Sequence, residues 1–428
     1  MKFAVIYPEI NDLARINDRR EFPPFGILYL AAILEQHNYQ VKLIKAKPHD
    51  YKFNLTEYEL IGFSFSSSAT YDLMKKCRFA SSYSKVSKII IGGFHASLYP
   101  DETFKDIKPD ILCIGESEET IIEILNNESL HSIDGIVFCK NDQLVFTKPR
   151  SLAKQIDKIP LPSRHLLNKD EFLMKNRLSN TDYLMTHVMF SRGCPFACHF
   201  CANKPTKPRY RSAEHICNEL IKLKKEYNIK GFAIVDDNFV VDKNKVIEIC
   251  ASISGLNLKW SALSRVDTID KETLTCLSHS GCIEIKYGIE SGSVGLLKAM
   301  NKNISIEQIK NAVQMTYELG IKVKVFIIHG YPGENIQTTN ETINLLTELK
   351  PFIERISLFK FVPLPGSYVF ENWQKFGIHN TKYSDNWNGK YSNYHIHHNH
   401  YHWWGSETDF QEMKDAYTVL NKFINKNW

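Results

Sequence analysis

Three cysteines lie within eight positions of the segment SRGCPFACHFCANK (191–204), at Cys194, Cys198 and Cys201. Three thiolates at this spacing can hold a metal centre, and two kinds of centre compete. Structural zinc takes four ligands, and His199 would have to complete a Cys3His set. Such zinc sites usually draw their ligands in pairs from two turns, and no second pair lies nearby. A four-iron cluster also takes cysteine thiolates, and three of them leave one iron for another molecule. The spacing therefore favours a catalytic iron–sulfur cluster over zinc.

A third interpretation of these cysteines is purely structural, as core residues at positions i, i+4 and i+7 of one helix face. Gly193 and Pro195 argue against it, because both residues predict a loop at this point. The remaining cysteines are scattered through apolar stretches, and we expect them to be small core residues. They are Cys77, Cys113, Cys139, Cys217, Cys250, Cys276 and Cys282.

The first 125 residues alternate β-rich runs with amphipathic stretches. This alternation predicts an α/β fold with a doubly wound parallel sheet, Rossmann-like or flavodoxin-like. Such sheets bind ligands beyond the carboxyl ends of their strands. Here those ends are rich in small residues, at 64–68, 92–93 and 115–117, which favours a backbone kept open for a large ligand, although each glycine can also simply end its strand. The predicted strands are 2–8, 40–46, 59–65, 88–93 and 110–115, with a helix at 25–38.

A second run of strand and helix patterns begins at residue 185. Six βα units favour a partial (β/α)6 barrel of the TIM type, whose chemistry sits at the carboxyl ends of the strands. The cysteine segment directly follows the first of these strands, and His329 ends the fifth, where it would contact substrate or cap the strand. The predicted strands are 185–191, 231–237, 258–264, 283–289, 322–330 and 355–363.

We expect four regions along the chain: an N-terminal domain (1–130), a connector (131–180), the barrel (181–370) and an irregular C-terminal segment (371–428). The connector contains a predicted hairpin at 135–150 and a proline-containing, extended linker at 156–167. The C-terminal segment is crowded with histidine and tryptophan. By composition it can bind metal, but a lid over the barrel mouth explains it better. Its histidines are His395, His397, His398, His400 and His402.

The composition excludes several classes of protein. A net charge of +5 over 428 residues is too small for a nucleic-acid groove. The longest apolar stretch, 25–34, is too short to span a bilayer, and the first residues do not read as a signal peptide. We therefore expect a cytoplasmic enzyme without a membrane span, whose thiols stay reduced.

The stretch CPFACHFC (194–201) has the Cys-x3-Cys-x2-Cys signature of the radical S-adenosylmethionine (SAM) superfamily. Further motifs agree with this resemblance in order along the barrel: VDDNF (235–239), SALSRVD (261–267), YGIESGS (287–293), IIHGYPGE (327–334) and FVPLPGS (361–367). The N-terminal half resembles the cobalamin-binding domain that precedes the barrel in one large subgroup. That resemblance rests on PPFGILYLAA (23–32), GGFHAS (92–97), GESEET (115–120) and the linker IPLPSRHLL. The chain thus resembles cobalamin-dependent radical SAM enzymes over residues 1–370.

The resemblance implies a set of ligands for three cofactors. It assigns the 4Fe-4S cluster to the three clustered cysteines. It places SAM against Asp236 and Asp237 (amino group), Ser264 and Arg265 (carboxylate), and Glu290 and Ser291. It places cobalamin against Ser66, Ser67, Ser68, Gly92, Gly93, His95, Gly115 and Glu116. Structural alternatives remain, since the two aspartates also suit a helix N-cap and Glu290 also suits a solvated loop.

The chain lacks the Asp-x-His-x-x-Gly motif whose histidine coordinates cobalt in many cobalamin-binding domains. Since the radical SAM subgroup commonly lacks it, the resemblance implies base-off cobalamin, with the nucleotide tail held away from cobalt. A domain of this fold that has lost its cofactor is the alternative.

By this resemblance the reduced cluster, supplied by a reductant such as flavodoxin or ferredoxin, cleaves SAM to a 5′-deoxyadenosyl radical. Methylcobalamin then provides a methyl group for an unactivated carbon, or phosphorus, of a small biosynthetic intermediate. Relatives that run cyclisations or ring contractions without net methylation are the nearest alternative. A tRNA methylthiolating enzyme would need three further cluster cysteines in the N-terminal domain, which are missing. A zinc-stabilised or cobalamin-sensing binding module is the alternative outside enzymes.

Overall fold

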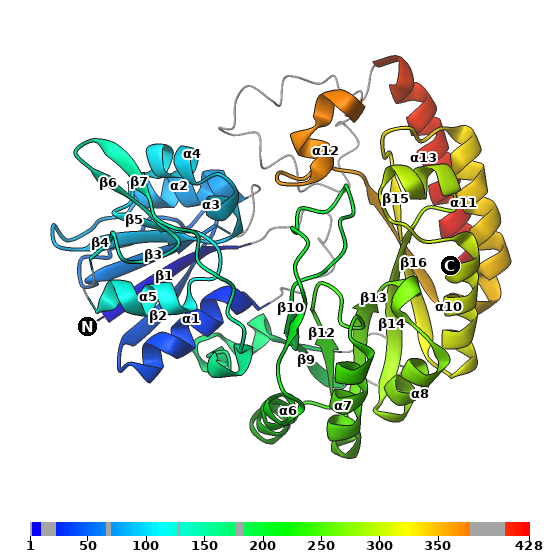
Figure 1. Ribbon diagram of the computed structural model, residues 1–428, viewed down its shortest axis with the longest axis horizontal. Helices are drawn as coiled ribbons and strands as arrows, with labels where there is room; N and C mark the ends of the chain where they lie inside the picture. Colours follow the sequence, from blue (N-terminus) through cyan, green and yellow to red (C-terminus); the bar gives the residue numbers. More distant parts are fainter. Residues whose placement is uncertain (1, 10–22, 66–69, 127–128, 176–182, 377–406) are drawn as a thin grey trace. The chain divides into compact units, whose positions relative to one another are not determined.

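The structure is a computed structural model that describes residues 2–9, 23–65, 70–126, 129–175, 183–376 and 407–428 (Figure 1). The chain divides into two compact units, and the break between them falls between Phe172 and Leu173. None of the described helices is long and apolar enough to cross a lipid bilayer.

The N-terminal unit is built on a seven-stranded sheet in the order β2-β1-β3-β4-β5-β6-β7. The first five strands pair in parallel in the flavodoxin-like order 2-1-3-4-5, so the predicted doubly wound sheet is confirmed. The predicted hairpin forms β6 and β7 and extends this sheet antiparallel to β5. The strands are β1 (Lys2–Pro8), β2 (Gln40–Ala46), β3 (Leu60–Ser64), β4 (Lys88–Gly92), β5 (Ile111–Cys113), β6 (Ile136–Lys140) and β7 (Gln143–Phe146).

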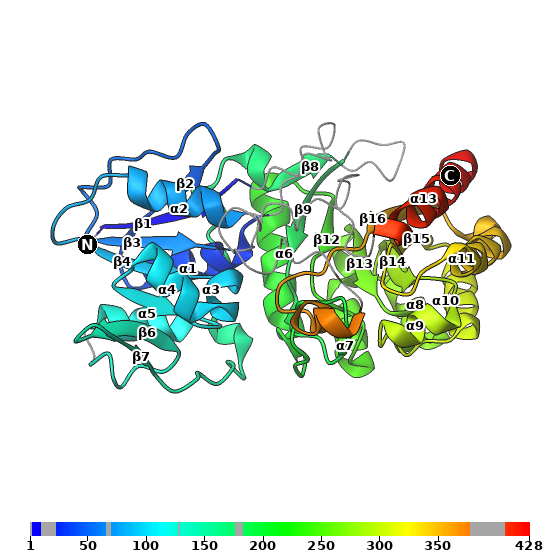
Figure 2. The same cartoon turned by 90° about the horizontal axis from the view of Figure 1, so that it is seen from above.

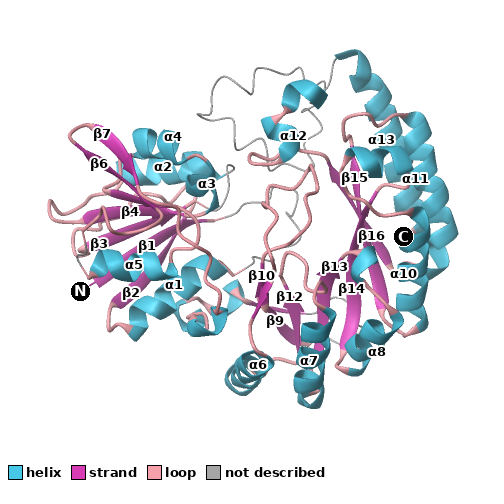
Figure 3. Cartoon of the chain, viewed as in Figure 1, coloured by secondary structure: helices cyan, strands magenta, loops and turns pink. Residues whose placement is uncertain are grey.

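Helices lie on both sides of this sheet (Figure 3). Alternation along the buried strand β1 explains why, because Ala4 and Ile6 join the apolar core formed with Met74 of α2 and Phe104 of α4. Helices α1 and α5 contact each other. The helices are α1 (Phe25–Gln36), α2 (Tyr71–Ala80), α3 (Phe94–Leu98), α4 (Pro100–Ile107) and α5 (Glu118–Leu125).

The second unit contains a seven-stranded sheet in which six parallel strands follow one another in chain order (Figure 2). This is the predicted partial (β/α)6 barrel, with the short strand β8 added antiparallel to β9 at one edge. The parallel strands are β9 (Leu184–Val188), β12 (Gly231–Ile234), β13 (Lys259–Ser264), β14 (Cys282–Glu290), β15 (Lys322–His329) and β16 (Arg355–Lys360); β8 is Leu173–Lys175.

The barrel strands bury one face against helices. On β15, Val323, Val325 and Ile327 are almost fully buried in the main core, whereas the alternating residues Lys324 and Phe326 are only half-buried. Buried and half-buried residues therefore alternate along this strand with a period of two. The helices are α6 (Ala213–Tyr227), α7 (Lys243–Ile253), α8 (Lys271–His279), α9 (Val294–Ala299), α10 (Ile306–Glu318), α11 (Ile336–Leu349) and α12 (Tyr368–Glu371).

Three expectations need correction. The C-terminal segment is not irregular throughout, because α13 (Glu407–Asn427) is a long helix packed on α11, and its buried residues Met413, Leu420 and Ile424 recur at helical spacing. The linker at 156–167 contains two short 3-10 turns rather than a continuous extended chain. Finally, Cys139 is exposed because its end of the hairpin faces solvent, whereas Cys77, Cys113, Cys250 and Cys282 are buried as expected, and Cys217 and Cys276 are half-buried.

Candidate active site

The three clustered cysteines lie in a loop, as Gly193 and Pro195 predicted, and not on a helix. The loop leaves β10 (Ser191–Arg192) and returns through β11 (Arg209–Tyr210), and these two strands pair antiparallel at its base. Inside the loop, the Thr206 amide donates to the Cys194 carbonyl at 2.8 Å. The loop thus follows the first parallel strand of the barrel, β9, at the end where this fold carries its chemistry.

Gly193 is required at the start of this loop. Its φ of +96° lies in the region that favours glycine, and a Cβ atom here would stand 2.5 Å from Thr206 Oγ1. A larger residue would therefore push apart the two ends of the cysteine loop.

The segment that follows α9 holds the cysteine loop from outside. The His199 amide donates to the Met300 carbonyl at 2.9 Å, and Asn301 Nδ2 donates to the Ala197 carbonyl at 2.7 Å. His199 Nδ1 lies 2.9 Å from the Ala299 carbonyl, and its ring stacks on Tyr368. These contacts fix the position of His199 between the α9 end and Tyr368.

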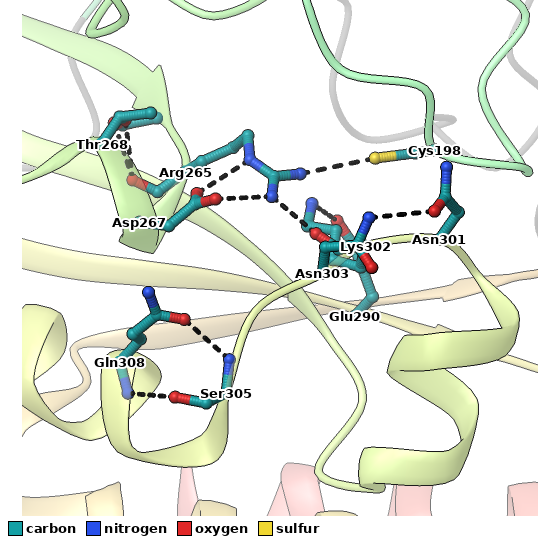
Figure 4. Close-up of polar contacts among 11 residues, drawn as sticks. Cys198, Arg265, Asp267, Thr268, Glu290, Asn301, Lys302, Asn303, Ser305 and Gln308 are labelled. Atoms are coloured by element: carbon teal, nitrogen blue, oxygen red, sulfur yellow. Dashed lines mark hydrogen bonds and ion pairs between the residues drawn. The ribbon is translucent and has the colours of Figure 1, made fainter.

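Arg265 links the barrel to the cysteine loop (Figure 4). Its Nε and Nη2 donate to the two carboxylate oxygens of Asp267, both at 2.8 Å, and Nη2 also donates to the Lys302 carbonyl at 2.6 Å. Its Nη1 lies 3.5 Å from Cys198 Sγ, and the guanidinium carbon lies 3.8 Å from the centre of the Phe196 ring. The structure thus joins two residues that the sequence assigned to different cofactors, Arg265 and Cys198.

Glu290 ends β14 and is buried, so the alternative of a solvated carboxylate is wrong. Lys302 Nζ donates to its Oε1 at 2.9 Å, and both side chains are less than one tenth exposed. The Glu290 backbone has a φ of +63°, which is uncommon for a residue with a side chain. Such backbone strain persists only where the surrounding structure holds the residue firmly. The contacts around Glu290 therefore fix its backbone conformation.

Asp236 and Asp237 support the base of the cysteine loop. Asp236 accepts hydrogen bonds from the Phe190 amide at 2.8 Å and from Ser191 Oγ at 2.6 Å, directly before the loop. Asp237 accepts from Asn203 Nδ2 at 2.7 Å, inside the loop. The N-cap of α7 is Asp242, so the N-cap alternative for the two aspartates is wrong.

Burial dominates the acidity of these groups. It raises the pKa of Asp236 to about 7, although the two hydrogen bonds oppose the shift, and it also raises the pKa of Asp237. Burial likewise raises the pKa of Cys194 and raises that of Cys201 to about 11, and the neighbouring cysteines add to both shifts. Burial thus favours the protonated thiols, whereas metal binding requires thiolates.

The cysteine loop fits a four-iron cluster. Among the described residues, no group of three or more histidine, cysteine, aspartate or glutamate side chains converges as the ligands of one metal ion do. A four-iron cluster does not need such convergence, because each thiolate binds a different iron. A non-helical loop with three interacting thiols and a guanidinium beside one of them meets its requirements.

The remaining SAM residues lie at the carboxyl ends of two barrel strands, where Ser264 ends β13 and Ser291 follows β14. Ser264 Oγ bonds to the Arg265 carbonyl and to Thr268, and Ser291 Oγ bonds to Thr342 of α11. Several residues that reach the cysteine loop carried no assignment from sequence. Phe196, Asn203 and Asp267 stood inside quoted segments, whereas no local pattern marks Asn301 or Lys302.

In the N-terminal unit, the predicted cobalamin residues lie at the carboxyl ends of strands. Gly92 ends β4, and Gly93 precedes α3 with a φ of +105°, where a Cβ atom would stand 2.5 Å from the Phe65 carbonyl oxygen. Gly115 follows β5 with a φ of +80°, and a Cβ atom there would meet nothing within 4 Å. This open backbone fits a large ligand. Ser66, Ser67 and Ser68 lie outside the described residues.

Two further members of this set have side-chain contacts inside the unit. Glu116 accepts a hydrogen bond from the Ala153 amide at 3.4 Å. His95 is buried between the rings of Tyr71 and Tyr99, and burial lowers its pKa to about 4. His95 is therefore neutral at physiological pH.

His329 turns away from the open face of the barrel. It is buried, its Nε2 lies 3.2 Å from the Met413 carbonyl, and its ring packs against Tyr417 of α13. The predicted contact with substrate is therefore wrong for this residue, because the same strand alternation that buries Ile327 turns His329 toward the helices. The five histidines at 395–402 lie outside the described residues.

Comparison with known proteins finds one family match in the N-terminal unit and another in the second unit. Residues 188–346 match the radical SAM superfamily, and residues 13–125 match the B12 binding domain. An uncharacterised methyltransferase of Pyrococcus horikoshii is 28% identical over 405 residues, covering 88% of this chain and 86% of that protein. Cytidylyl-2-hydroxyethylphosphonate methyltransferase of Streptomyces wedmorensis is 27% identical over 413 residues, covering 80% and 76%.

Two other similarities extend this picture. Anaerobic magnesium-protoporphyrin IX monomethyl ester cyclase of Rubrivivax gelatinosus is 23% identical over 376 residues, covering 82% of this chain and 66% of that protein. The solved structure of the radical SAM methyltransferase TsrM from Kitasatospora setae, with cobalamin and a [4Fe-4S] cluster bound, superimposes with a TM-score of 0.65 at 16% identity, covering 88% of this chain and 75% of that one. At that identity the superposition shows a shared fold.

Proposed function

Because this chain belongs to the radical SAM superfamily and carries a B12-binding domain ahead of its radical SAM domain, we propose that it is a cobalamin-dependent methyltransferase. The substrate we infer is a small biosynthetic intermediate, methylated at an unactivated carbon or at phosphorus. The observation that carries the proposal is the cysteine loop at the end of the first barrel strand, in a chain whose N-terminal strand ends offer an open glycine backbone. Two of the relatives are named methyltransferases, which supports methyl transfer as the outcome.

When bound, the three cofactors supply reductive cleavage of SAM and a transferable methyl group. The chain's own residues would position and orient these cofactors. Cys194, Cys198 and Cys201 would hold the cluster in this proposal, which would leave one iron without a protein ligand and available to SAM. Arg265 and Lys302 bring two buried cations to that end of the barrel, each paired with one carboxylate. The network is therefore neutral, which limits the cost of burying its charges.

The finer parts of the proposal concern cofactor state and partners. We infer base-off cobalamin, because the Asp-x-His-x-x-Gly histidine is absent from the sequence. We also infer a cytoplasmic enzyme that takes its electron from flavodoxin or ferredoxin. Asp236, Asp237, Ser264, Glu290 and Ser291 remain our SAM-side residues, either in contact with SAM or as supports of the loops that contact it.

The test starts with anaerobic reconstitution with iron and sulfide, followed by iron and cobalt analysis and a visible spectrum for base-off cobalamin. The protein is then incubated with dithionite, methyl-deuterated SAM and cytidylyl-2-hydroxyethylphosphonate, and in parallel with the small-molecule fraction of a cell extract. Deuterated methyl in a product, together with 5′-deoxyadenosine, is the expected result. Zinc in place of iron would overturn the proposal.

Cyclisation without net methylation is the second candidate, and the cyclase named among the relatives favours it. The same incubation separates the two reactions. A new product that forms with 5′-deoxyadenosine but never carries deuterium would replace the methyltransferase with a ring-forming enzyme.

A further inference from the structure

Every nitrogen of the Arg265 guanidinium has a partner. Asp267 takes two N–H groups, the Lys302 carbonyl takes one, and Cys198 Sγ takes one, so four of the five N–H groups of the fork are used. Phe196 covers the flat face, and the side chain is only 7% exposed. The guanidinium is thus a fixed donor aimed at a sulfur atom.

Two surrounding contacts hold the Arg265 guanidinium and the Cys198 sulfur in position relative to each other. Lys302, whose carbonyl accepts from Arg265, is itself tied to β14 through Glu290, and its Nζ lies 5.7 Å from the ring of Phe200 in the cysteine loop. The neighbouring Asn301 donates to the carbonyl of Ala197, one residue before Cys198. The donor and the thiolate are therefore fixed by the same short segment, 301–302.

We propose that Arg265 is a positioning residue of the iron–sulfur cluster, which donates an N–H to the Cys198 thiolate and thereby raises the reduction potential of the cluster. The proposal rests on the proposed function, since it requires the cluster. The physical reason is charge. One-electron reduction adds negative charge to the cluster and its thiolates, so a cationic N–H donor stabilises the reduced form more than the oxidised form. Asp267 orients the donor, which an unpaired arginine side chain would leave free to turn away.

The test compares Arg265→Met and Arg265→Lys with the wild-type chain, each reconstituted anaerobically. The cluster is titrated with titanium(III) citrate or dithionite and followed by electron paramagnetic resonance, without SAM, so that contacts with the SAM carboxylate do not enter the readout. For Arg265→Met we expect a more negative midpoint and a ratio of reduced to oxidised cluster that is roughly tenfold lower at a fixed potential, the scale of one charged hydrogen bond. Arg265→Lys keeps the charge but not the fork, so an intermediate shift is expected.

Arg355→Lys is the matched control. Arg355 is also paired bidentately with a buried carboxylate, that of Glu284, but no contact of either residue reaches the cysteine loop among the described residues. We expect its midpoint to equal that of the wild type. Asn301→Ala removes the bond to Ala197 and keeps the sulfur donor itself, so it should release iron to a chelator faster and lower the midpoint by less than Arg265→Met does.

A loaded Arg265→Met cluster with the wild-type midpoint would overturn the inference. If that variant loads no iron, Arg265→Lys decides, and a wild-type midpoint there would overturn it equally. Failure of the proposed function gives a different result: without a cluster the wild-type chain shows no reducible signal, and with a cluster but no methyl transfer the midpoints still decide the role of Arg265.

Discussion

The cysteine loop and the glycine-rich strand ends of the N-terminal unit are both predicted cofactor sites, but they are constructed from different material. Side chains build the first, through ion pairs and hydrogen bonds that meet at Arg265 and Cys198. Backbone builds the second, where Gly93 and Gly115 adopt positive φ: Gly93 packs tightly against the Phe65 backbone, and Gly115 leaves open space beside the chain. A small charged ligand is held by directed hydrogen-bond donors, whereas a large cofactor needs open space beside the backbone. Each region thus matches the ligand predicted for it.

The same contrast appears in buried titratable groups. The barrel buries Asp236, whose pKa is raised, and the N-terminal unit buries His95, whose pKa is lowered. Burial disfavours the charged form in each case, so each pKa shifts in the direction that favours the neutral group. The two units therefore should respond to pH in opposite directions.

The largest expected effect comes from breaking the side-chain site at its ligands. Cys198→Ala should lose the cluster and all SAM cleavage, because two thiolates cannot hold the cluster in this loop. Cys276→Ala, a change at a half-buried cysteine of α8, should keep both and is the control. Iron content and 5′-deoxyadenosine formation measure the outcome, and a Cys198→Ala protein that still cleaves SAM would contradict the assignment.

Gly93→Ala should break the backbone site. The added Cβ would stand 2.5 Å from the Phe65 carbonyl at a φ of +105°. Strain and clash together cost roughly 2–6 kcal/mol, and the strand end proposed to face cobalamin shifts. We expect loss of bound cobalt with the iron content unchanged. Gly255→Ala, in the second unit at a position where a Cβ meets nothing within 4 Å, should keep the cobalt.

Asp236→Asn tests the comparison through the pH dependence of folding stability. The folded-state pKa of about 7 lies above the value of 3.8 for an ordinary aspartate, so the folded chain holds a proton that the unfolded chain releases. The stability that this provides is full below pH 4 and is lost as the pH rises to about 7, by at most ~4 kcal/mol. Asparagine can keep both hydrogen bonds without titrating. In thermal unfolding between pH 5 and 8.5, the variant should gain several degrees on the wild type as pH rises. Asp242→Asn, an exposed N-cap change, measures the background.

His95→Phe tests the opposite sign in the N-terminal unit. The folded-state pKa of about 4 lies below the ordinary 6.5, so the stability from a neutral His95 is present above pH 6.5 and is lost as the pH falls toward 4. Relative to the wild type, the variant should therefore be more stable at pH 5 than at pH 8, by about 2 kcal/mol, and thermal unfolding at the two pH values measures this difference. A difference between the two proteins that does not change with pH would show that His95 is not held neutral by burial.

Much of the architecture follows from local pattern. β1 and β2 have the residues predicted for them, and the six parallel barrel strands begin within one residue of prediction, because period-two burial and helical periodicity are written in the sequence. The missed helix α13 shows the limit. Its apolar residues have helical spacing, but the irregular segment was predicted from the composition of the histidine-rich stretch before it.

The sequence by itself determined the sheet types, the loop around Cys194, Cys198 and Cys201 and the glycines that end the N-terminal strands. These features depend on spacing and on residues with special backbone geometry. Only the tertiary structure decided that Arg265 reaches Cys198, that Lys302 pairs with Glu290 and that His329 turns toward α13. Such contacts join residues that are distant along the chain, and nothing in local periodicity records which of them the folded barrel brings together.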